Sequence, residues 1–518
     1  MNKLLTHITI TKIGHGGVWL ATLPDGKTII VKGGVLPGSV VDLKIVKSKK
    51  DYIECHVVTV HHMDPARFSW TIKCPHYLFH PDRATLPVHK SGCGGCKRQI
   101  LDYDHQLLTK QQIVIDSFHH LSDVIDTIGW IPLPLWSPHI FGYRNKIEFS
   151  FGKYITSTID SNGIKKKTIE SDRSVGFHRQ GQFAKIIDID ACYLVDSQIN
   201  HIFTYCKKLL HSLWLPVYDQ KTHQWALRHL MMRQGKHTDQ VMVVLSLSDT
   251  QLSPTAWKQF VEDVKSDSTL TSLVTTLVIV INNGLADIIY DRESHQVVLR
   301  WEGCIDEELH ILPLSSQILS SPSLWSTPCI ATFRISPTSF FQTNTSGAEI
   351  LFQTAYQMIV QHIPPLSHKD ILDLYCGTGT IGIIMSKLWL GQRLIGIDSV
   401  ASAIIDAQSN ALRNGIADAY FVSGRAEQIV GSDPLIPYES LGLIIVDPPR
   451  EWLHSDMTQY LIELKNKSDF GLCYISCNPV TLARDISLLI TWWYTLVALQ
   501  PVDMFPHTHH IETIAILR

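Results

Sequence analysis

The sequence has few of the features that mark a specialised class of protein. Its longest apolar runs, at 273–281 and around 488–499, fall short of the roughly 20 residues that a membrane-spanning helix needs. The N-terminus has no apolar segment of signal-peptide length, and the chain shows no internal repeat and no low-complexity tract. These absences predict a soluble, cytoplasmic protein that binds no membrane.

Charge and cysteine content exclude further classes. The net charge is only −3 with 18% charged residues, so any nucleic-acid binding has to come from local patches. The eleven cysteines are an odd number, scattered along a chain without a secretion signal. This pattern favours free thiols or metal ligands over a disulfide framework.

The 518 residues are enough for two to four domains. Residues 1–62 alternate apolar and polar positions in short runs broken by Gly and Pro, which predicts a small antiparallel β-barrel without helices. Residues 63–330 are mixed α+β, with a helix at about 103–121 that we expect to pack on the last domain. Residues 331–518 repeat the order strand, glycine loop, helix and strand, which predicts a doubly wound α/β domain with a parallel sheet.

A glycine loop is the clearest local signal in the last domain. A short apolar strand ends at Tyr375 and runs into Gly377-x-Gly379-x-x-Gly382 and a helix, and the next strand ends at Asp398. Glycines let a ligand approach the backbone, and an acid in this place can accept hydrogen bonds from ribose hydroxyls. The loop fits a dinucleotide or S-adenosylmethionine, and a turn that only packs helix on sheet is the alternative.

A second motif, Asp447-Pro-Pro-Arg450, follows another apolar strand. The two prolines stiffen the turn and direct the Asp447 carboxylate and nearby carbonyls at the crevice above the strand ends. Such turns are frequent in methyltransferases that act on bases. Arg450 stands where enzymes that methylate amines carry an aromatic residue, which argues against an exocyclic amine as target. A simple loop with an Asp cap is the alternative.

Cys477 follows the strand at 471–476, where an Asn-Pro turn precedes a helix. A helix N-terminus favours the thiolate form of a nearby thiol, which suits a nucleophile. Carbon 5 of uracil accepts a methyl group readily only after a thiolate has added to carbon 6 and made an enolate. The alternative interpretation is a small buried hydrophobe, which we expect for Cys376 and Cys473.

Such a mechanism also needs a base to remove the proton from carbon 5. The segment at 502–517 offers Glu512, with His507, His509 and His510 nearby.

Five motifs in this order resemble the RNA uracil-5-methyltransferases of the TrmA and RumA type: FRISPTSFFQTN, DLYCGTGTIG, VDPPR, YISCNPVTLARD and DMFPHTHHIE. The resemblance covers nearly the whole chain, since residues 1–62 look like an RNA-binding TRAM domain and the middle resembles the family's central domain. It implies transfer of a methyl group from S-adenosylmethionine to carbon 5 of a uridine in structured RNA.

The resemblance also assigns roles to residues. Cys477 matches the family's nucleophile and Glu512 its general base. The positions that hold S-adenosylmethionine are matched by Gln342, Tyr375, Asp398 and Asp447.

Three departures from the family pattern stand out. The chain has Asp398 where the family usually has Glu, and Thr380 where some members have Asn; residues 451–454 lack the usual glycine. Because Asp is one methylene shorter than Glu, we expect a weaker ribose contact with activity retained.

A separate group of cysteines lies upstream. Four thiolates complete either a tetrahedral zinc site or a 4Fe-4S cluster, and spacing alone does not choose between them. The ligands would be Cys74, Cys93, Cys96 and Cys192. The resemblance implies a 4Fe-4S cluster, as in the rRNA-modifying members, acting as a clip and not in redox chemistry. The 18 residues between Cys74 and Cys93 exceed the family spacing, which leaves Cys55 as a substitute first ligand.

Local basic patches, which suit phosphate groups, indicate where RNA could contact the protein. They comprise Lys44, Lys47, Lys49 and Lys50, then Lys165–Lys167, and then Arg144 with Lys146. A stacked uridine hides carbon 6, so we expect the target base to be flipped out, with aromatic side chains such as Phe341 as packing surfaces.

The barrel and the cysteine group favour 23S rRNA as the substrate of a monomeric enzyme that does not act on DNA, and tRNA is the alternative. Two other classes of function compete. A dinucleotide-dependent oxidoreductase would leave Cys477 and the barrel unexplained. An inactive RNA-binding assembly factor would leave Cys477, Asp447 and Glu512 without a purpose.

Overall fold

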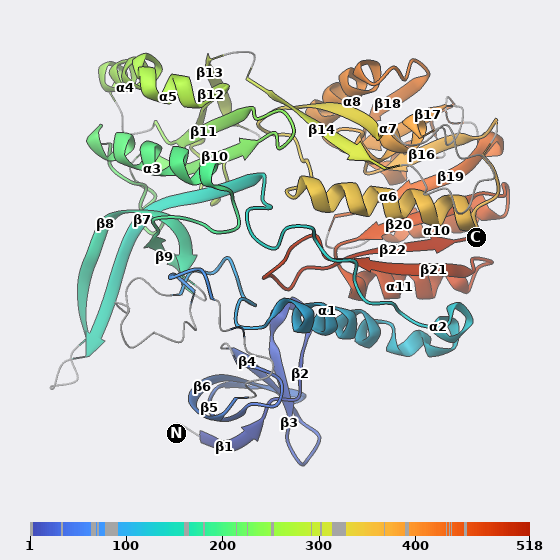
Figure 1. Ribbon diagram of the computed structural model, residues 1–518, viewed down its shortest axis with the longest axis horizontal. Coiled ribbons are helices and arrows are strands. Elements are labelled where there is room, and N and C mark those ends of the chain that lie inside the picture. The colour runs from blue at the N-terminus through green and yellow to red at the C-terminus, as the bar shows by residue number, and fades with distance from the viewer. Residues whose placement is uncertain are drawn as a thin grey trace.

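The computed structural model describes the chain except for the residues given at the end of this sentence: 1–3, 33–34, 64–68, 70–71, 78–91, 160–164, 180–181, 214, 225, 250–252, 292, 301–302, 313–327, 367, 389–392, 431, 435, 437 and 450–452. In Figure 1 the N-terminal β domain lies at the bottom, the central domain at the upper left and the C-terminal α/β domain at the right. In the part of the chain described, no helix is long and apolar enough to cross a membrane.

The N-terminal domain is a six-stranded sheet in the order β1-β5-β6-β4-β3-β2. Its strands are β1 (Leu4–Thr9), β2 (Lys12–Ile13), β3 (Trp19–Thr22), β4 (Thr28–Lys32), β5 (Val40–Ser48) and β6 (Tyr52–His62). Two details differ from the expected antiparallel, helix-free barrel. A 3-10 turn covers His15–Gly17, and β4 pairs parallel with β6 because two chain reversals separate them.

The central domain has a seven-stranded sheet in the order β13-β12-β11-β10-β7-β8-β9. Its strands are β7 (Lys146–Ile159), β8 (Lys165–Arg179), β9 (Gln182–Asp188), β10 (Leu227–Gln234), β11 (Val241–Leu247), β12 (Thr276–Ile281) and β13 (His295–Arg300). One face is covered by α3 (Ser197–Ser212), α4 (Pro254–Ser266) and α5 (Ser268–Leu273). A hairpin of β14 (Ile305–Ile311) and β15 (Cys329–Ile335) joins this domain to the next.

The C-terminal domain has the predicted doubly wound fold, with sheet order β18-β17-β16-β19-β20-β22-β21. Its strands are β16 (Asp370–Leu374), β17 (Leu394–Asp398), β18 (Ala419–Ser423), β19 (Leu441–Val446), β20 (Gly471–Ser476), β21 (Leu496–Val502) and β22 (Glu512–Leu517). Only β22 runs against its neighbours. The parallel strands therefore end at one edge of the sheet, where α/β proteins bind their ligands.

Apolar cores lie on both faces of this sheet. The helices are α6 (Thr345–His362), α7 (Thr380–Lys387), α8 (Ala401–Arg413), α9 (Ala426–Ile429), α10 (Ser455–Lys465) and α11 (Pro479–Ile490), with a 3-10 turn at Tyr438–Ser440. The first three pack on one face and the last three on the other.

Helix α1 (Tyr103–Ser117) bridges two domains. Ile113 belongs to the core of the N-terminal sheet, while its neighbour Val114 lies in the core of the C-terminal domain. A 3-10 turn at His119–Leu121 and α2 (Ser122–Ile128) follow, so the helix expected at 103–121 ends as an α-helix at Ser117. The chain then runs along the edge of the C-terminal sheet, where Leu135 pairs with Val502.

Candidate active site

The glycine loop connects β16 to α7 and adopts a conformation that ordinary residues avoid. Tyr375 has a φ of 63°, and Gly379, the N-cap of α7, has a φ of 77°. A Cβ on Gly379 would lie 2.9 Å from Ile383 Cδ1, so glycine is required there for space as well as for conformation. The glycines thus allow the tight turn that joins β16 to α7.

Asp398 ends β17 and faces this loop. Its Oδ2 accepts a hydrogen bond of 2.9 Å from the Gly377 N–H, and its Oδ1 accepts one of 2.8 Å from the Val400 N–H. The carboxylate therefore fixes the glycine loop to the turn after β17. Each oxygen keeps a lone pair that can accept a hydrogen bond from a ligand.

Two further carboxyl groups lie at the ends of neighbouring strands. Asp447 follows β19, and burial raises its pKa to about 7. Asp373, on β16, accepts a 2.9 Å hydrogen bond from the Gly382 N–H through Oδ2. Burial, with the carboxylates of Asp447 and Asp398, raises the pKa of Asp373 to about 8. Among the described residues its Oδ1 has no hydrogen-bond partner.

Asp373 was missed by the sequence argument, although it belongs to the strand that leads into the glycine loop. Burial thus raises the pKa of both Asp373 and Asp447, and the neighbouring carboxylates raise that of Asp373 further. A ligand with positive charge would relieve both effects. Cys376 and Cys473, by contrast, are buried in the apolar core, as expected.

Cys477 lies at the same edge of the sheet, directly after β20, and is half-buried. The next residue, Asn478, is the N-cap of α11, and its side chain accepts a 3.1 Å hydrogen bond from the Val480 N–H. Ser476 Oγ accepts a 3.2 Å hydrogen bond from the Asn478 N–H. This turn fixes the position of Cys477 at the start of the helix.

Glu512 is the first residue of β22 and only 4% exposed. The antiparallel ladder between β20 and β22 ends with the pair Ser476 and Thr513. One further step of the same register puts Cys477 opposite Glu512. Residues opposite each other in antiparallel strands have Cα atoms about 4.5–5.5 Å apart, which is the separation that a continued register would give this pair.

Gln342 lies beside the first turn of α6. The Asn145 side chain donates a 2.9 Å hydrogen bond to the Gln342 carbonyl. Asn344, the N-cap of α6, donates one of 2.8 Å to the Met504 carbonyl. These contacts tie the segment that carries Gln342 to the central domain and to the loop that precedes Glu512.

The aromatic residues next to Gln342 differ from the prediction. Phe341 is 3% exposed and packs in the core against Phe333, so it offers no surface to a base. Its neighbour Phe340 is 65% exposed. The sequence argument named only Phe341, and the structure shows that its neighbour Phe340 is the accessible residue of the two.

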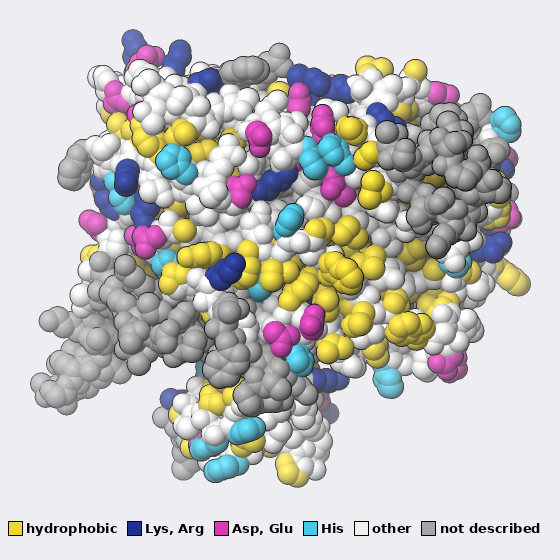
Figure 2. Space-filling view, viewed as in Figure 1, with side chains coloured by type: hydrophobic (Ala, Val, Ile, Leu, Met, Phe, Trp, Pro, Cys, Tyr) yellow, Lys and Arg dark blue, Asp and Glu magenta, His cyan; other side chains and the backbone are white. Residues whose placement is uncertain are grey.

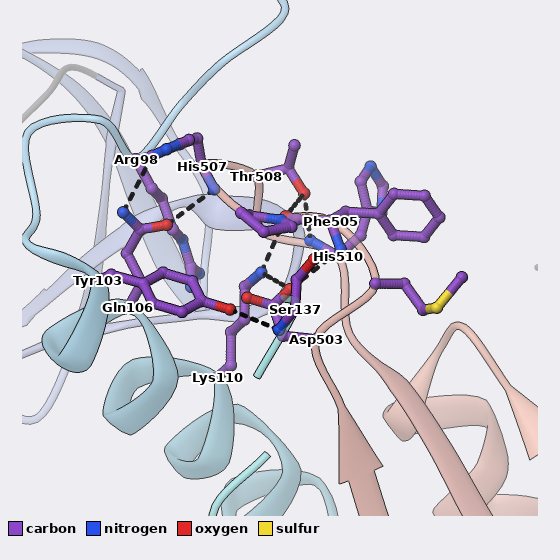
Figure 3. Close-up of polar contacts among 12 residues, drawn as sticks. Arg98, Tyr103, Gln106, Lys110, Ser137, Asp503, Phe505, His507, Thr508 and His510 are labelled. Atoms are coloured by element: carbon purple, nitrogen blue, oxygen red, sulfur yellow. Dashed lines mark hydrogen bonds and ion pairs between the residues drawn. The ribbon is translucent and has the colours of Figure 1, made fainter. Parts of the chain in front are cut away.

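The three histidines of the loop also differ from one another. His507 is buried, and burial together with the charges of Lys110 and Lys73 lowers its pKa to about 3. It therefore stays neutral and is a poor acid-base candidate. Figure 3 shows His507 among the residues that contact this loop. The rings of His509 and His510, which are closer to Glu512 in the sequence, have centroids 4.0 Å apart.

The four upstream cysteines line one cavity, together with Gln99 and Arg144; they are Cys74, Cys93, Cys96 and Cys192. Burial raises the pKa of each thiol, for Cys74 to about 11. The substitute ligand, Cys55, is instead buried in the core of the N-terminal domain. The cavity thus collects the predicted set from three separate segments of the chain.

The spacing of these sulfurs bears on the metal that they could bind. In the described part of the chain, ligand atoms of three His, Cys, Asp or Glu residues come within 4.8 Å of one another only at His7, Asp42 and His61 and at His237, His310 and Glu349. No three of the four sulfurs form such a group, whereas a tetrahedral zinc with 2.3 Å bonds needs sulfurs roughly 3.8 Å apart.

Neither histidine group is a metal centre as it stands. Their paired imidazole rings are stacked, with interplanar angles of 7° and 13°. Nitrogen lone pairs lie in the plane of the ring, so nearly parallel rings cannot direct them at one ion.

The basic patches differ in what they offer to RNA. The side chains of Lys44, Lys47, Lys49 and Lys50 are exposed, as phosphate contacts require. Lys146 pairs with Glu148 at 2.6 Å, which offsets its charge, while Arg144 lines the cysteine cavity. The side chains of Lys165–Lys167 lie outside the part of the chain that the structure describes.

Comparison with known proteins gives consistent matches. A model of the tRNA (uracil-5-)-methyltransferase family matches residues 330–518. An uncharacterized RNA methyltransferase of Chlorobaculum tepidum is 32% identical over 99% of this chain and 95% of its own length. One of Caldanaerobacter subterraneus is 30% identical over 95% of this chain and 94% of its own.

A solved structure matches over the whole length. The tRNA (uracil-54, C5)-methyltransferase of Pyrococcus abyssi, in complex with S-adenosyl-L-homocysteine, has a TM-score of 0.67 and covers 99% of both chains at 24% identity. At this identity the likeness establishes the shared fold, from the N-terminal sheet to the last strand.

Proposed function

Because the chain belongs to the RNA uracil-5-methyltransferase family and is an S-adenosylmethionine-dependent RNA methyltransferase, we propose that it methylates carbon 5 of a uridine through a covalent adduct with Cys477. One observation carries this proposal. The ladder of β20 and β22 ends so that Cys477 and Glu512 become the next opposing residues. We assign them as nucleophile and base at the edge where the parallel strands of the sheet end.

The steps follow from these two side chains. The Cys477 thiolate adds to carbon 6 of the uracil and makes carbon 5 electron-rich. S-adenosylmethionine, when bound, supplies the methyl group that carbon 5 takes up. Glu512 removes the proton from carbon 5, and the bond between carbon 6 and sulfur breaks, which restores the ring double bond and frees the thiolate. The N-terminus of α11 favours the thiolate in both its attacking and its leaving role.

The proposed binding site of S-adenosylmethionine comprises Gln342, Tyr375, Asp398 and Asp447. The position of Asp398 between the glycine loop and the β17 turn supports a ribose contact. The carboxyl groups of Asp373, Asp398 and Asp447 fit a ligand that carries a sulfonium and an ammonium group, because positive charge favours ionised carboxylates. The unpartnered Oδ1 of Asp373 adds an acceptor there that the sequence argument did not include.

The flipped uridine and its neighbours need planar apolar surfaces. Phe340, two residues before Gln342, offers one. Hydrophobic side chains also gather across the middle of the face in Figure 2, where the chain after α2 crosses the molecule in Figure 1. Trp130 and Trp136 on that segment are each 67% exposed. Exposed aromatic rings stack on unpaired bases with little regard to sequence.

The proposed substrate is 23S rRNA, bound by a monomer, and tRNA is the second candidate. The similarity to the Pyrococcus abyssi tRNA enzyme favours tRNA and extends over the N-terminal sheet, so that sheet does not discriminate between the two. The four-cysteine set is what supports rRNA. Mapping 5-methyluridine in total RNA from cells with and without the gene decides between them.

We also propose that the four cysteines hold a 4Fe-4S cluster as a structural clip. The single cavity that all four cysteines line supports a shared group, and each ligand of such a cluster binds a different iron atom, whereas zinc draws all four sulfurs to one ion. Cys96 lies next to the residues that contact the loop before Glu512, so a cluster would order that region. Measuring iron and acid-labile sulfide in protein purified without oxygen tests this proposal.

The covalent step has its own test. RNA with 5-fluorouridine at the target lacks the proton that Glu512 removes, so a stable protein–RNA adduct should accumulate. Cys477→Ala should abolish it, and Cys329→Ala, at the start of β15, should not. An adduct that persists in Cys477→Ala would refute the assignment of the nucleophile.

A further inference from the structure

The loop 503–511, which connects β21 to β22 and ends at Glu512, is held by a residue from outside the C-terminal domain. Lys110 of α1 reaches it with an Nζ that lies 2.6 Å from Asp503 Oδ1 and 3.0 Å from the Phe505 carbonyl (Figure 3). Both charged side chains are 0% exposed. Lys110 also lies outside residues 330–518, to which the family model matches.

The same N-terminal segment contacts the loop a second time, at His507. Gln106 Oε1 accepts a 2.8 Å hydrogen bond from the His507 N–H, and the N–H groups of Lys97 and Arg98 each donate to the His507 carbonyl at 3.0 Å. His507 has a φ of 65°, a conformation that a non-glycine residue keeps only when its surroundings impose it. The loop therefore has its shape imposed by α1 and the turn before it.

The buried ion pair is a poor device for stability alone. Removing two charges from water costs several kcal/mol per ion in proteins, and well-packed apolar residues in place of such a pair often leave the protein equally stable. What the pair does provide is position, because Lys110 reaches one carboxylate and one carbonyl that are two residues apart on the same loop. Loss of the pair should therefore shift the end of the loop, where Glu512 lies.

We propose that Lys110 is a positioning residue that holds Glu512 in place for removal of the carbon 5 proton. This inference rests on the proposed function. Cys477 is fixed independently, by β20 and the capped start of α11. Loss of Lys110 should therefore slow proton removal while leaving attack and methyl transfer in operation, so the methylated adduct between Cys477 and RNA should accumulate.

The test uses the full-length protein with unmodified substrate RNA and S-adenosylmethionine. Lys110→Met should lower kcat by about a hundredfold, the effect of a misplacement of about 1 Å, with the Kd of S-adenosylmethionine unchanged. A covalent protein–RNA band should appear, as it should for Glu512→Gln. The matched control is Lys465→Met, because Lys465, 11% exposed, also donates to a carboxylate, Asp469, and to a carbonyl, Phe470. This control should turn over without an adduct.

A double variant separates positioning from folding. Lys110→Met with Asp503→Asn removes both charges of the pair and keeps the Oδ1 that accepts a hydrogen bond from the Phe505 N–H, so it should regain part of the thermal stability but still accumulate the adduct. Recovery of turnover in the double variant would overturn the inference, as would loss of activity without an adduct in Lys110→Met. If Glu512→Gln itself trapped no RNA, the assignment of the base would fail, and the role of Lys110 with it; if only Lys110→Met trapped none, the inference alone would fail.

Discussion

Cys477 and Glu512 are the first residues beyond the last pair of the β20–β22 ladder, Ser476 and Thr513, and a continued register would make them opposite each other. Because β22 is the one strand that runs against the sheet, its first residue meets the carboxyl end of β20. The thiol follows one strand and the carboxyl group starts the other. A single antiparallel strand thus brings a carboxyl group to the edge where the parallel strands end.

Cys477→Ala should abolish methylation and change stability little, because the side chain is half-buried in a turn. Cys473 is buried in β20, the strand before Cys477. Cys473→Ala should therefore retain methyl-transfer activity but lower the free energy of unfolding, since a cavity replaces the buried sulfur. Methyl-transfer assays and chemical denaturation of both variants check this pair. Full activity of Cys477→Ala would refute its role.

Affinity for S-adenosylmethionine should rise with pH through about 7. The pKa of Asp447 is raised to about 7 from an ordinary value of 3.8, so the folded protein without ligand holds a proton there in acid. The stability that this proton confers is complete below 3.8 and is lost as pH rises through about 7. A cationic ligand favours the ionised form and binds more tightly above that pH.

Calorimetric titration between pH 6 and pH 8.5 tests the pH effect. Asp447→Asn should bind S-adenosylmethionine more weakly and flatten the pH dependence. A profile that is equally steep in Asp447→Asn would assign the titration to another group, such as Asp373.

Phe340→Ala and Phe341→Ala should separate binding from stability. Phe340→Ala removes an exposed ring and should weaken RNA affinity by roughly 1–3 kcal/mol if a base stacks on it, with little change in the free energy of unfolding. Phe341→Ala leaves a cavity in the core and should destabilise the fold by about 3–5 kcal/mol. RNA-binding titrations and thermal unfolding distinguish the two, and equal RNA affinity of wild type and Phe340→Ala would exclude the stacking role.

Cys96→Ser should lower the iron content and the thermal stability. Activity should fall with stability and should not depend on the redox state of a bound cluster, because methyl transfer involves no electron transfer. Metal analysis with activity assays under reducing and oxidising conditions checks this. A full complement of iron in Cys96→Ser would remove Cys96 from the ligand set.

The sequence predicted those parts of the site that contiguous motifs encode. The glycine loop, the strand end at Asp398 and the position of Cys477 after a strand all depend on residues within about one element of each other, and alternation and glycine spacing report such local geometry. The doubly wound fold follows from the repeated order of these elements.

Other features depend on contacts that no local pattern records. Lys110 and Asp503 are 393 positions apart, and neither lies in a motif that predicts an ion pair. Adjacent Phe340 and Phe341 have equal hydrophobicity, so only packing decides which one faces the core. His507 resembles its neighbours in composition, but burial removes it from acid-base chemistry.

Trapping with Glu512→Gln on ordinary RNA tests the central claim most directly. With S-adenosylmethionine present, this variant should complete the attack and the methyl transfer but not the removal of the carbon 5 proton. Mass spectrometry of the digested adduct should then find a methylated uridine attached to Cys477. Methylated RNA released at the wild-type rate, or a uridine attached to any other residue, would contradict the pairing of Cys477 with Glu512.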